Sequence, residues 1–151
     1  MLERSGPNRG ELAKAQLILQ EAEAKLERVV VLLAERMVER HDLETNIRET
    51  AATGDMDQVL ALQSRFNLVE KTIAELRANE AECSRRVESA RRYLYTLYVR
   101  LEKLRQEFSI LMRRLASMDQ GESVPVDVQS NIGKIKIQLK AITGENSTGR
   151  L

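Results

Sequence analysis

The chain has 151 residues and a formal net charge of +1, with 42% hydrophobic and 31% charged residues. Its single cysteine, Cys83, excludes an intramolecular disulfide and a cysteine-based structural zinc site. The longest apolar run covers the six residues 29–34, whereas a membrane span needs roughly 20. The balanced charge argues against strong attraction of the whole molecule to nucleic acid or anionic lipid. This composition is typical of long helices and coiled coils.

The first ten residues contain two glycines and a proline and show no apolar period, so residues 1–10 are predicted to form a flexible lead. They also lack the apolar stretch of a secretory signal. We therefore expect the protein in the cytoplasm, or inside a virion or a comparable assembly.

A heptad pattern begins at Glu11 and predicts a first helix over residues 11–51. Nine of its twelve positions, spaced alternately three and four residues apart, are apolar, which is the period of a left-handed coiled coil. Arg36 and Arg40 interrupt this seam, and we expect them to fix the register or the choice of partner. The twelve positions are Leu12, Ala15, Leu19, Ala22, Leu26, Val29, Leu33, Arg36, Arg40, Leu43, Ile47 and Thr50.

A short break follows, in which Gly54 can take the left-handed conformation that ends a helix and Asp55 can cap the next helix. A loop this short predicts an antiparallel hairpin with a second helix over residues 56–119. Seventeen of the eighteen seam positions in that helix are apolar, and Cys83 is one of them, as a core residue. The loop length selects a register in which facing residue numbers sum to 109, so that Leu33 meets Leu76 and Leu43 meets Phe66.

The second helix continues beyond the point where the first helix can cover it. We call the six apolar seam residues in this part of the helix, from Leu101 to Met118, the overhang. Burying one large apolar side chain contributes roughly 1.5–3 kcal/mol, so six of them represent on the order of 10 kcal/mol. The first helix also carries a second apolar stripe that a two-helix coil does not need. We expect other chains to cover both surfaces, with the chain's own tail as an alternative cover for the overhang. The predicted partner interface is Leu101, Leu104, Phe108, Leu111, Leu115, Met118, Leu17, Val31 and Val38.

The tail, residues 120–151, allows two interpretations. Residues 124–128 and 135–141 alternate as strands do, which predicts a β-hairpin over 124–141 with a turn near Gly133. The alternative is a short helix with Ile132, Ile135, Leu139 and Ile142 on one face. The glycine and the β-branched residues favour the strands. The last eight residues are expected to be disordered.

One segment of the second helix combines arginine with tyrosine. Such a group can form the hot spot of a protein interface, or it can bind anions such as nucleic-acid phosphates. The tyrosines do not share one narrow face, which favours the protein interface. The candidate residues are Arg91, Arg92, Tyr93, Tyr95 and Tyr98.

The sequence offers no candidate for catalysis. It contains no glycine-rich phosphate loop, no nucleophile–base set and no metal-binding cluster, and His41 stands alone among charged residues. We therefore predict a non-enzymatic protein without a cofactor or a metal.

The segment Arg65-Phe66-Asn67-Leu68-Val69-Glu70-Lys71-Thr72-Ile73-Ala74-Glu75-Leu76 resembles the opening of the second helix in the FliJ family, the coiled-coil stalks of flagellar export ATPases, and in their type III secretion relatives. The similarity covers about 60 residues, and the chain length and the hairpin fit it too. The resemblance implies a hexameric ATPase ring as partner, with the hairpin inserted in its centre.

The sequence as a whole predicts an all-α protein, a long antiparallel coiled-coil hairpin over residues 11–119 with a short C-terminal tail. The expected function is that of a structural or interaction subunit, either a homo-oligomer or part of a larger complex, that builds or bridges a protein assembly. A FliJ-like stalk is the first alternative, and an accessory protein that binds nucleic acid is the second.

Overall fold

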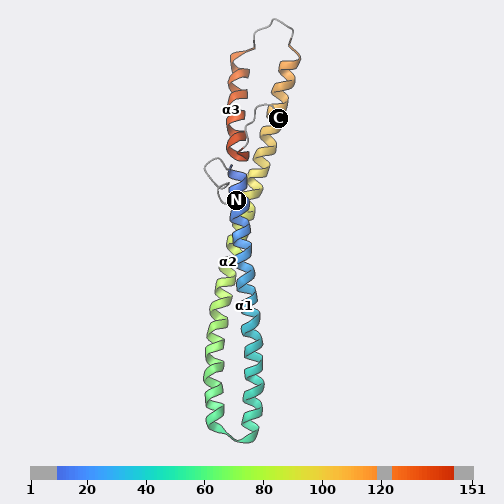
Figure 1. The fold of residues 1–151 in the computed structure, drawn as a ribbon. Coiled ribbons are helices and arrows are strands. Elements are labelled where there is room, and N and C mark those ends of the chain that lie inside the picture. Colours follow the sequence, from blue (N-terminus) through green and yellow to red (C-terminus); the bar gives the residue numbers. More distant parts are fainter. Residues whose placement is uncertain (1–9, 119–123, 145–151) are drawn as a thin grey trace. The chain divides into compact units, whose positions relative to one another are not determined.

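The computed structural model describes residues 10–118 and 124–144, and within these ranges it contains helices and no strand (Figure 1). The prediction of an all-α fold is therefore confirmed. The predicted flexible lead and the predicted disordered end lie outside the described ranges, except for Gly10 and Gly144. For these two residues the predictions are wrong, because each is hydrogen-bonded at the end of a helix. The helices are α1 (Glu11–Thr53), α2 (Met56–Ala116) and α3 (Val126–Thr143).

The chain divides into two compact units. The turn unit is Gln20–Glu88 and contains the connection between α1 and α2. The terminal unit consists of Met1–Leu19 and Ser89–Leu151, so the start of α1, the second half of α2 and all of α3 belong to it.

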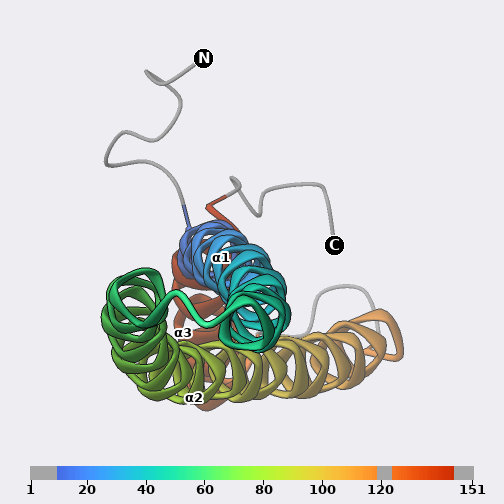
Figure 2. The same ribbon diagram turned by 90° about the horizontal axis from the view of Figure 1, so that it is seen from below.

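In the turn unit, a tight connection reverses the chain between α1 and α2 (Figure 2). Gly54 has a φ of 83°, in the left-handed region that favours glycine, and its N–H donates to the carbonyl of Ala51 at 3.1 Å. Asp55 Oδ1 accepts a hydrogen bond from the backbone N–H of Gln58 at 3.2 Å and so caps α2. Both residues act as their sequence context predicts, and α1 ends at Thr53, two residues later than expected.

The core of the turn unit lies where the two helices meet. Leu33 and Leu43 of α1 are buried against Val69 and Ile73 of α2, and three partly buried residues, Leu62, Phe66 and Leu76, pack on this cluster. Leu33 and Leu43 are seam positions of the first helix. On the second helix, the seam spacing of alternately four and three residues connects Leu62, Phe66, Val69, Ile73 and Leu76. The pairs expected from the register, Leu33 with Leu76 and Leu43 with Phe66, lie within this one cluster.

The core of the terminal unit is built by α2 and α3. Leu101, Leu104 and Phe108 of α2 are buried together with residues of α3, and Leu12 of α1 packs against the same cluster. Leu139 and Ile142 are the most enclosed members, with exposed fractions of 1% and 0%. The contributing residues of α3 are Ile132, Ile135, Leu139 and Ile142.

The β-hairpin prediction for residues 124–141 is wrong, because the segment forms α3 and buries the helical alternative's apolar face. In a strand, Ile137 and Leu139 would share a face, whereas in α3 Ile137 is 72% exposed and Leu139 is buried. Pro125 sets the start of the helix, and Gly144 ends it with a φ of 74° and a hydrogen bond from its N–H to the Lys140 carbonyl at 2.7 Å.

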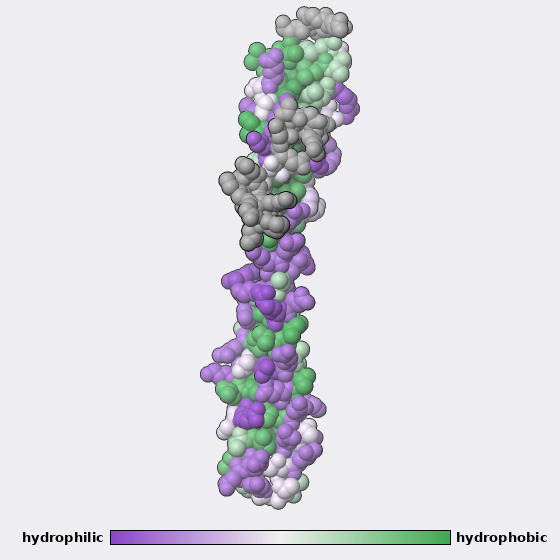
Figure 3. All heavy atoms as spheres, viewed as in Figure 1, coloured by the Kyte–Doolittle hydropathy of each residue, from purple (hydrophilic) through white to green (hydrophobic). Residues whose placement is uncertain are grey.

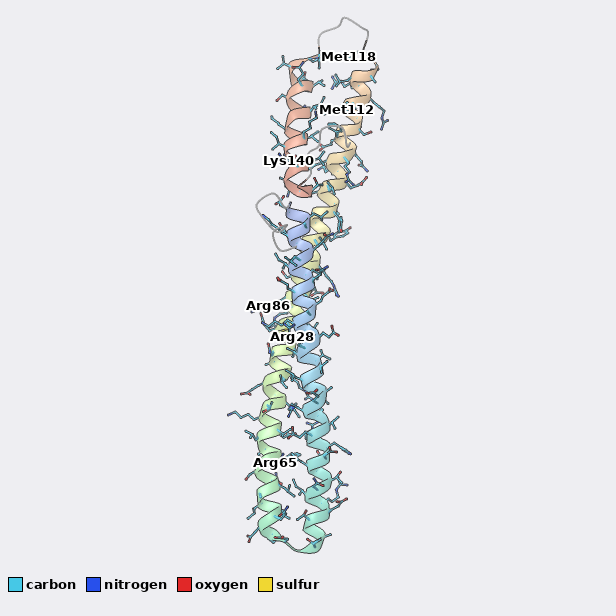
Figure 4. The ribbon with its side chains drawn as sticks, in the orientation of Figure 1. Arg28, Arg65, Arg86, Met112, Met118 and Lys140 are labelled. Carbon is cyan, nitrogen blue, oxygen red and sulfur yellow. The ribbon has the colours of Figure 1, made fainter. Side chains whose placement is uncertain are left out.

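The same packing changes the status of the apolar overhang on α2. The chain's own α3 buries Leu101, Leu104 and Phe108. The tail, which was the alternative cover, thus takes the place of the other chain expected there. Leu111 and Leu115 are partly buried, as is Met118, which follows the end of α2 (Figure 4). The helix ends at Ala116 rather than at the expected residue 119.

Candidate interaction surfaces

An apolar stripe on α1 stays uncovered in the turn unit. Val31 and Val38 are 49% and 63% exposed, and Ala24, one heptad earlier, is also exposed. We call Ala24, Val31 and Val38 the outer stripe. It is exposed because α2 packs on the other side of α1, where Val29, Leu33 and Leu43 are buried. Leu17, the further predicted interface residue, lies in the terminal unit and is 38% exposed.

The flanks of the outer stripe are mostly acidic. Glu27, Glu35 and Asp42 are exposed and lie within one turn of the stripe residues, on the same side of α1, and the exposed Arg28 is the basic residue among them. On the face seen in Figure 3, apolar surface is exposed between charged side chains over the region of the turn unit. An acidic helix with apolar residues at heptad spacing is suited to bind a basic, apolar partner surface.

The two arginines that interrupt the seam of α1 are ion-paired. Arg36 Nη1 lies 2.5 Å from Glu39 Oε1 on the same helix. Arg40 Nη1 lies 3.0 Å from Glu70 Oε2, which links α1 to α2. Arg65 of α2, labelled in Figure 4, adds a longer contact of 3.7 Å to Glu39. Of the two seam arginines, Arg40 pairs across the two helices and Arg36 pairs within α1, so a role in fixing the register stays a prediction.

A groove of about 420 Å³ lies between α2 and α3 in the terminal unit. Ile110, on its α2 side, is 59% exposed although it is a large apolar residue. We call it the α2–α3 groove, and its lining residues are Glu107, Ile110, Leu111, Asn131, Lys134, Ile135 and Gln138. The β-hairpin prediction for residues 124–141 does not allow this groove, because the helix α3 forms one of its walls.

Basic residues dominate the edges of the α2–α3 groove. Lys134 lines it from α3, while Lys103 and Arg114 are exposed one turn before and one turn after the α2 residues that line it, on the same side of the helix. Two residues there are acidic, namely Glu107 in the lining and the exposed Asp127, one turn before Asn131 on α3. The groove thus combines apolar surface with a positive rim.

The charge difference extends to the two units as a whole. The turn unit contains 10 basic and 15 acidic residues, a net charge of −5. The other residues contain 14 basic and 8 acidic, a net charge of +6. The near-neutral total therefore conceals two units of opposite charge.

The structure does not gather the arginine–tyrosine group onto one surface. Tyr93 and Tyr95, 48% and 70% exposed, lie two positions apart and so point to different sides of α2. Tyr98 Oη accepts a hydrogen bond from Gln16 Nε2 of α1 at 3.0 Å. Tyr98 therefore contributes to the packing of the terminal unit, and Arg91 and Arg92 remain exposed beside the other tyrosines.

One carboxyl group has a shifted pKa. Glu82 accepts hydrogen bonds from Arg85 at 2.5 Å and from Arg86 at 3.1 Å on the same helix. The bond from Arg85 and the positive charge beside it, with the bond from Arg86, hold the pKa of Glu82 below its ordinary value. Both partners follow Glu82 by three or four residues, the favourable spacing for a surface pair on a helix.

The described part of the chain holds no buried polar or charged side chain, and no group of three or more His, Cys, Asp or Glu residues that could bind a metal ion. Cys83 is a buried free thiol on the seam. Over the same ranges, none of the helices has both the length and the apolarity that crossing a bilayer requires. No family model matches the chain, and no curated protein or solved structure is significantly similar to it.

Proposed function

We propose that this protein is a non-enzymatic structural and interaction subunit, a coiled-coil hairpin that builds or bridges a protein assembly by helix packing. The observation that carries the proposal is the outer stripe. Val31 and Val38 are 49% and 63% exposed and seven residues apart, although α1 already fills its contact with α2 through other residues.

The spacing of the stripe suits a further helix. Residues that repeat every seven positions act as the knobs of a coiled coil when a neighbouring helix supplies the holes. Fully burying a valine contributes roughly 1.5–3 kcal/mol, so Val31 and Val38 together supply a useful share of a binding free energy. The helix thus offers one face to its own partner α2 and a second face to another chain.

The non-enzymatic part of the proposal rests on the character of the described surfaces. The α2–α3 groove is lined by one carboxylate, one ammonium group, two amides and apolar side chains, without an adjacent nucleophile and base. Among the described residues, the shifted pKa is that of Glu82, whose exposed ion pairs are ordinary helix-surface chemistry.

Site-specific photo-crosslinking in cells that express the protein tests the proposal. A photoreactive residue at Val31 or Val38 should give discrete protein adducts, whose partner peptides mass spectrometry identifies. Lys71, exposed on the side of α2 away from the seam, is the matched control position and should give far fewer adducts. Adducts that are absent at the stripe, or equally abundant at Lys71, would contradict the proposal.

The resemblance of residues 65–76 to the FliJ family makes an export-ATPase stalk the second candidate. A stalk should remain monomeric when purified alone, and its crosslinks should join it to a subunit of an ATPase ring. A nucleic-acid accessory protein, the third candidate, should give no protein adducts at the stripe. Its binding to nucleic acid should weaken steeply with salt and on replacement of Arg91 and Arg92.

A further inference from the structure

We infer that the partner of the outer stripe is a second copy of this chain, and that the stripe of one copy docks in the α2–α3 groove of the other. The inference rests on the proposed function, because it names the partner of the same stripe. The inference goes beyond the proposed function because it assigns both surfaces of the contact to the same chain.

The two units of the chain carry opposite net charges. The turn unit, which carries the stripe, has a net charge of −5, and the residues of the terminal unit, which carries the groove, have a net charge of +6. A contact between like units of two copies would set like charges against each other. Pairing the turn unit of one copy with the terminal unit of another sets opposite charges together, and long-range attraction then steers the encounter.

The charged residues beside the outer stripe are opposite in sign to most of those at the edges of the groove. The outer stripe is flanked by Glu27, Glu35 and Asp42, and the groove is edged by Lys103, Arg114 and Lys134, all of them exposed. When the stripe enters the groove, carboxylates on both of its sides meet ammonium and guanidinium groups on the rim. Rim pairs of this kind contribute more to specificity and association rate than to affinity.

The residues that line the groove follow the spacing of one helix face on both of its helices. Its lining residues on α3 are Asn131, Lys134, Ile135 and Gln138, at positions i, i+3, i+4 and i+7 of the helix. On α2, Glu107, Ile110 and Leu111 follow the same spacing. On each helix these residues therefore share one face, against which the side chains of a further helix can pack.

The stripe valines would meet the three apolar residues of the lining, Ile110, Leu111 and Ile135. The α3 lining spans two helical turns, about 10 Å along the axis, which is the distance between residues one heptad apart. Val31 and Val38 have that separation and are both uncovered, while Ile110 in the groove is 59% exposed. Docking would remove all three apolar side chains from water. A polyanion would satisfy the positive rim but would leave Ile110 without an apolar partner.

Charge-swapped variants test the inference, with molar mass measured by light scattering over a range of protein and salt concentrations. The rim variant is R114E/K134E and the stripe variant is E27K/D42K. The matched controls have the same changes of charge on other faces, R105E/K136E for the rim and E44K/E75K for the stripe. All eight positions are at least partly exposed, and circular dichroism of each variant verifies that its helices are intact.

The unaltered chain and both controls should form dimers or larger assemblies that weaken as salt is raised. The rim variant alone and the stripe variant alone should associate at least about tenfold more weakly, because each then sets like charges together. Mixed in equal amounts, the two variants should associate again, since the reversed rim of one meets the reversed stripe of the other. An unfolded variant cannot produce this recovery.

A chain that is monomeric at every concentration and salt level, or a mixture that does not recover association, would overturn the inference. The same holds if the rim variant associates normally but loses binding to a DNA duplex, because the groove would then serve a polyanion. These results leave the proposed function open to its own test. Adducts between Val31 and a different protein would support an interaction subunit while excluding self-docking.

Discussion

Gly10 shows how a single residue constrains the terminal unit. It is buried directly before α1, and its carbonyl accepts the hydrogen bond from the Lys14 N–H at 3.2 Å. A Cβ at this position would lie 2.5 Å from the carbonyl oxygen of Ile142, and it would also collide with the N atom of Gly144. Since these are backbone atoms at the end of α3, a larger residue can be accommodated only if that helix end moves.

Gly10→Ala should therefore destabilise the protein, by about 1–3 kcal/mol if the cost is that of ordinary overpacking. Gly133→Ala is the matched control, because a Cβ there meets nothing within 4 Å. Alanine is favoured over glycine in a helix interior, so this change should stabilise α3 by about 1 kcal/mol. Urea unfolding followed by circular dichroism measures both, and a shift of the same sign in the two variants would contradict the packing at Gly10.

Glu82 provides a prediction about pH. Its pKa is lowered first by the hydrogen bond from Arg85, so the ionised form is the one favoured by folding. This contribution is present above the ordinary glutamate pKa and is lost as the pH falls through the lowered pKa of the folded state. Arg85→Gln combined with Arg86→Gln should raise the Glu82 pKa toward its ordinary value, as measured by NMR titration of the carboxyl carbon. An unchanged titration curve would show that the arginines do not hold the carboxylate.

Among the elements, α3 owes its position to contacts that are distant in the sequence. Its residues alternate well enough to predict strands, and the helical spacing of Ile132, Ile135, Leu139 and Ile142 competes with that alternation. The apolar overhang of α2 decides between them, because a helix brings all four residues onto the one face that covers Leu101, Leu104 and Phe108. Local propensity yields to tertiary packing here.

Leu139→Ala and Ile137→Ala separate these two influences. Leu139 is 1% exposed, so its truncation should lower the free energy of unfolding by about 2–5 kcal/mol. Ile137 is 72% exposed, and its truncation should change stability by no more than about 0.5 kcal/mol. Thermal denaturation of the two variants measures the difference. If the segment paired as strands, the two residues would share a face and the variants would behave alike.

Local sequence signals specify the two long helices to a much greater extent than they specify α3. The heptad seam, the left-handed Gly54 and the Asp55 cap each act within a few residues, and each specifies the same helix–turn–helix order. The seam residues Leu33, Leu43, Val69 and Ile73 are buried together, as their spacing indicates. Helix ends were less predictable, because α1 extends to Thr53 and α2 stops at Ala116.

At the scale of the whole molecule, the two units have separate apolar clusters. One contains Leu33, Leu43, Val69 and Ile73, and the other contains residues of α2 and α3 around Leu139. Each unit should therefore respond to a core substitution mainly within itself, because a residue's packing contacts are with its own cluster.

Hydrogen exchange in Leu139→Ala measures this independence. Amides of α3 and of residues 97–111 in α2 should exchange faster than in the unaltered chain, since they surround the substitution. Amides near Leu43 and Val69, in the turn unit, should keep their protection. Leu43→Ala is the reciprocal control and should have the opposite pattern. Equal loss of protection in both units would show that they unfold as one.

The outer stripe and the α2–α3 groove differ in how far the sequence could predict them. Val31 and Val38 are readable as surplus apolar positions, because heptad counting needs only the spacing within one helix. The groove brings together Ile110 and Lys134, and their proximity depends on how α3 docks on α2. Heptad counting along one helix does not contain that information.

The sequence by itself determined the all-α class, the two long helices and the glycine turn between them, because periodicity, propensity and capping all act over a few residues. Only the tertiary structure decided that the tail is a helix and that it covers the end of α2. The charge is already uneven along the sequence, and the tertiary structure decided only how the charged residues are grouped into two units. Those outcomes depend on contacts between segments far apart in the chain, whose free energy exists only once the chain has folded.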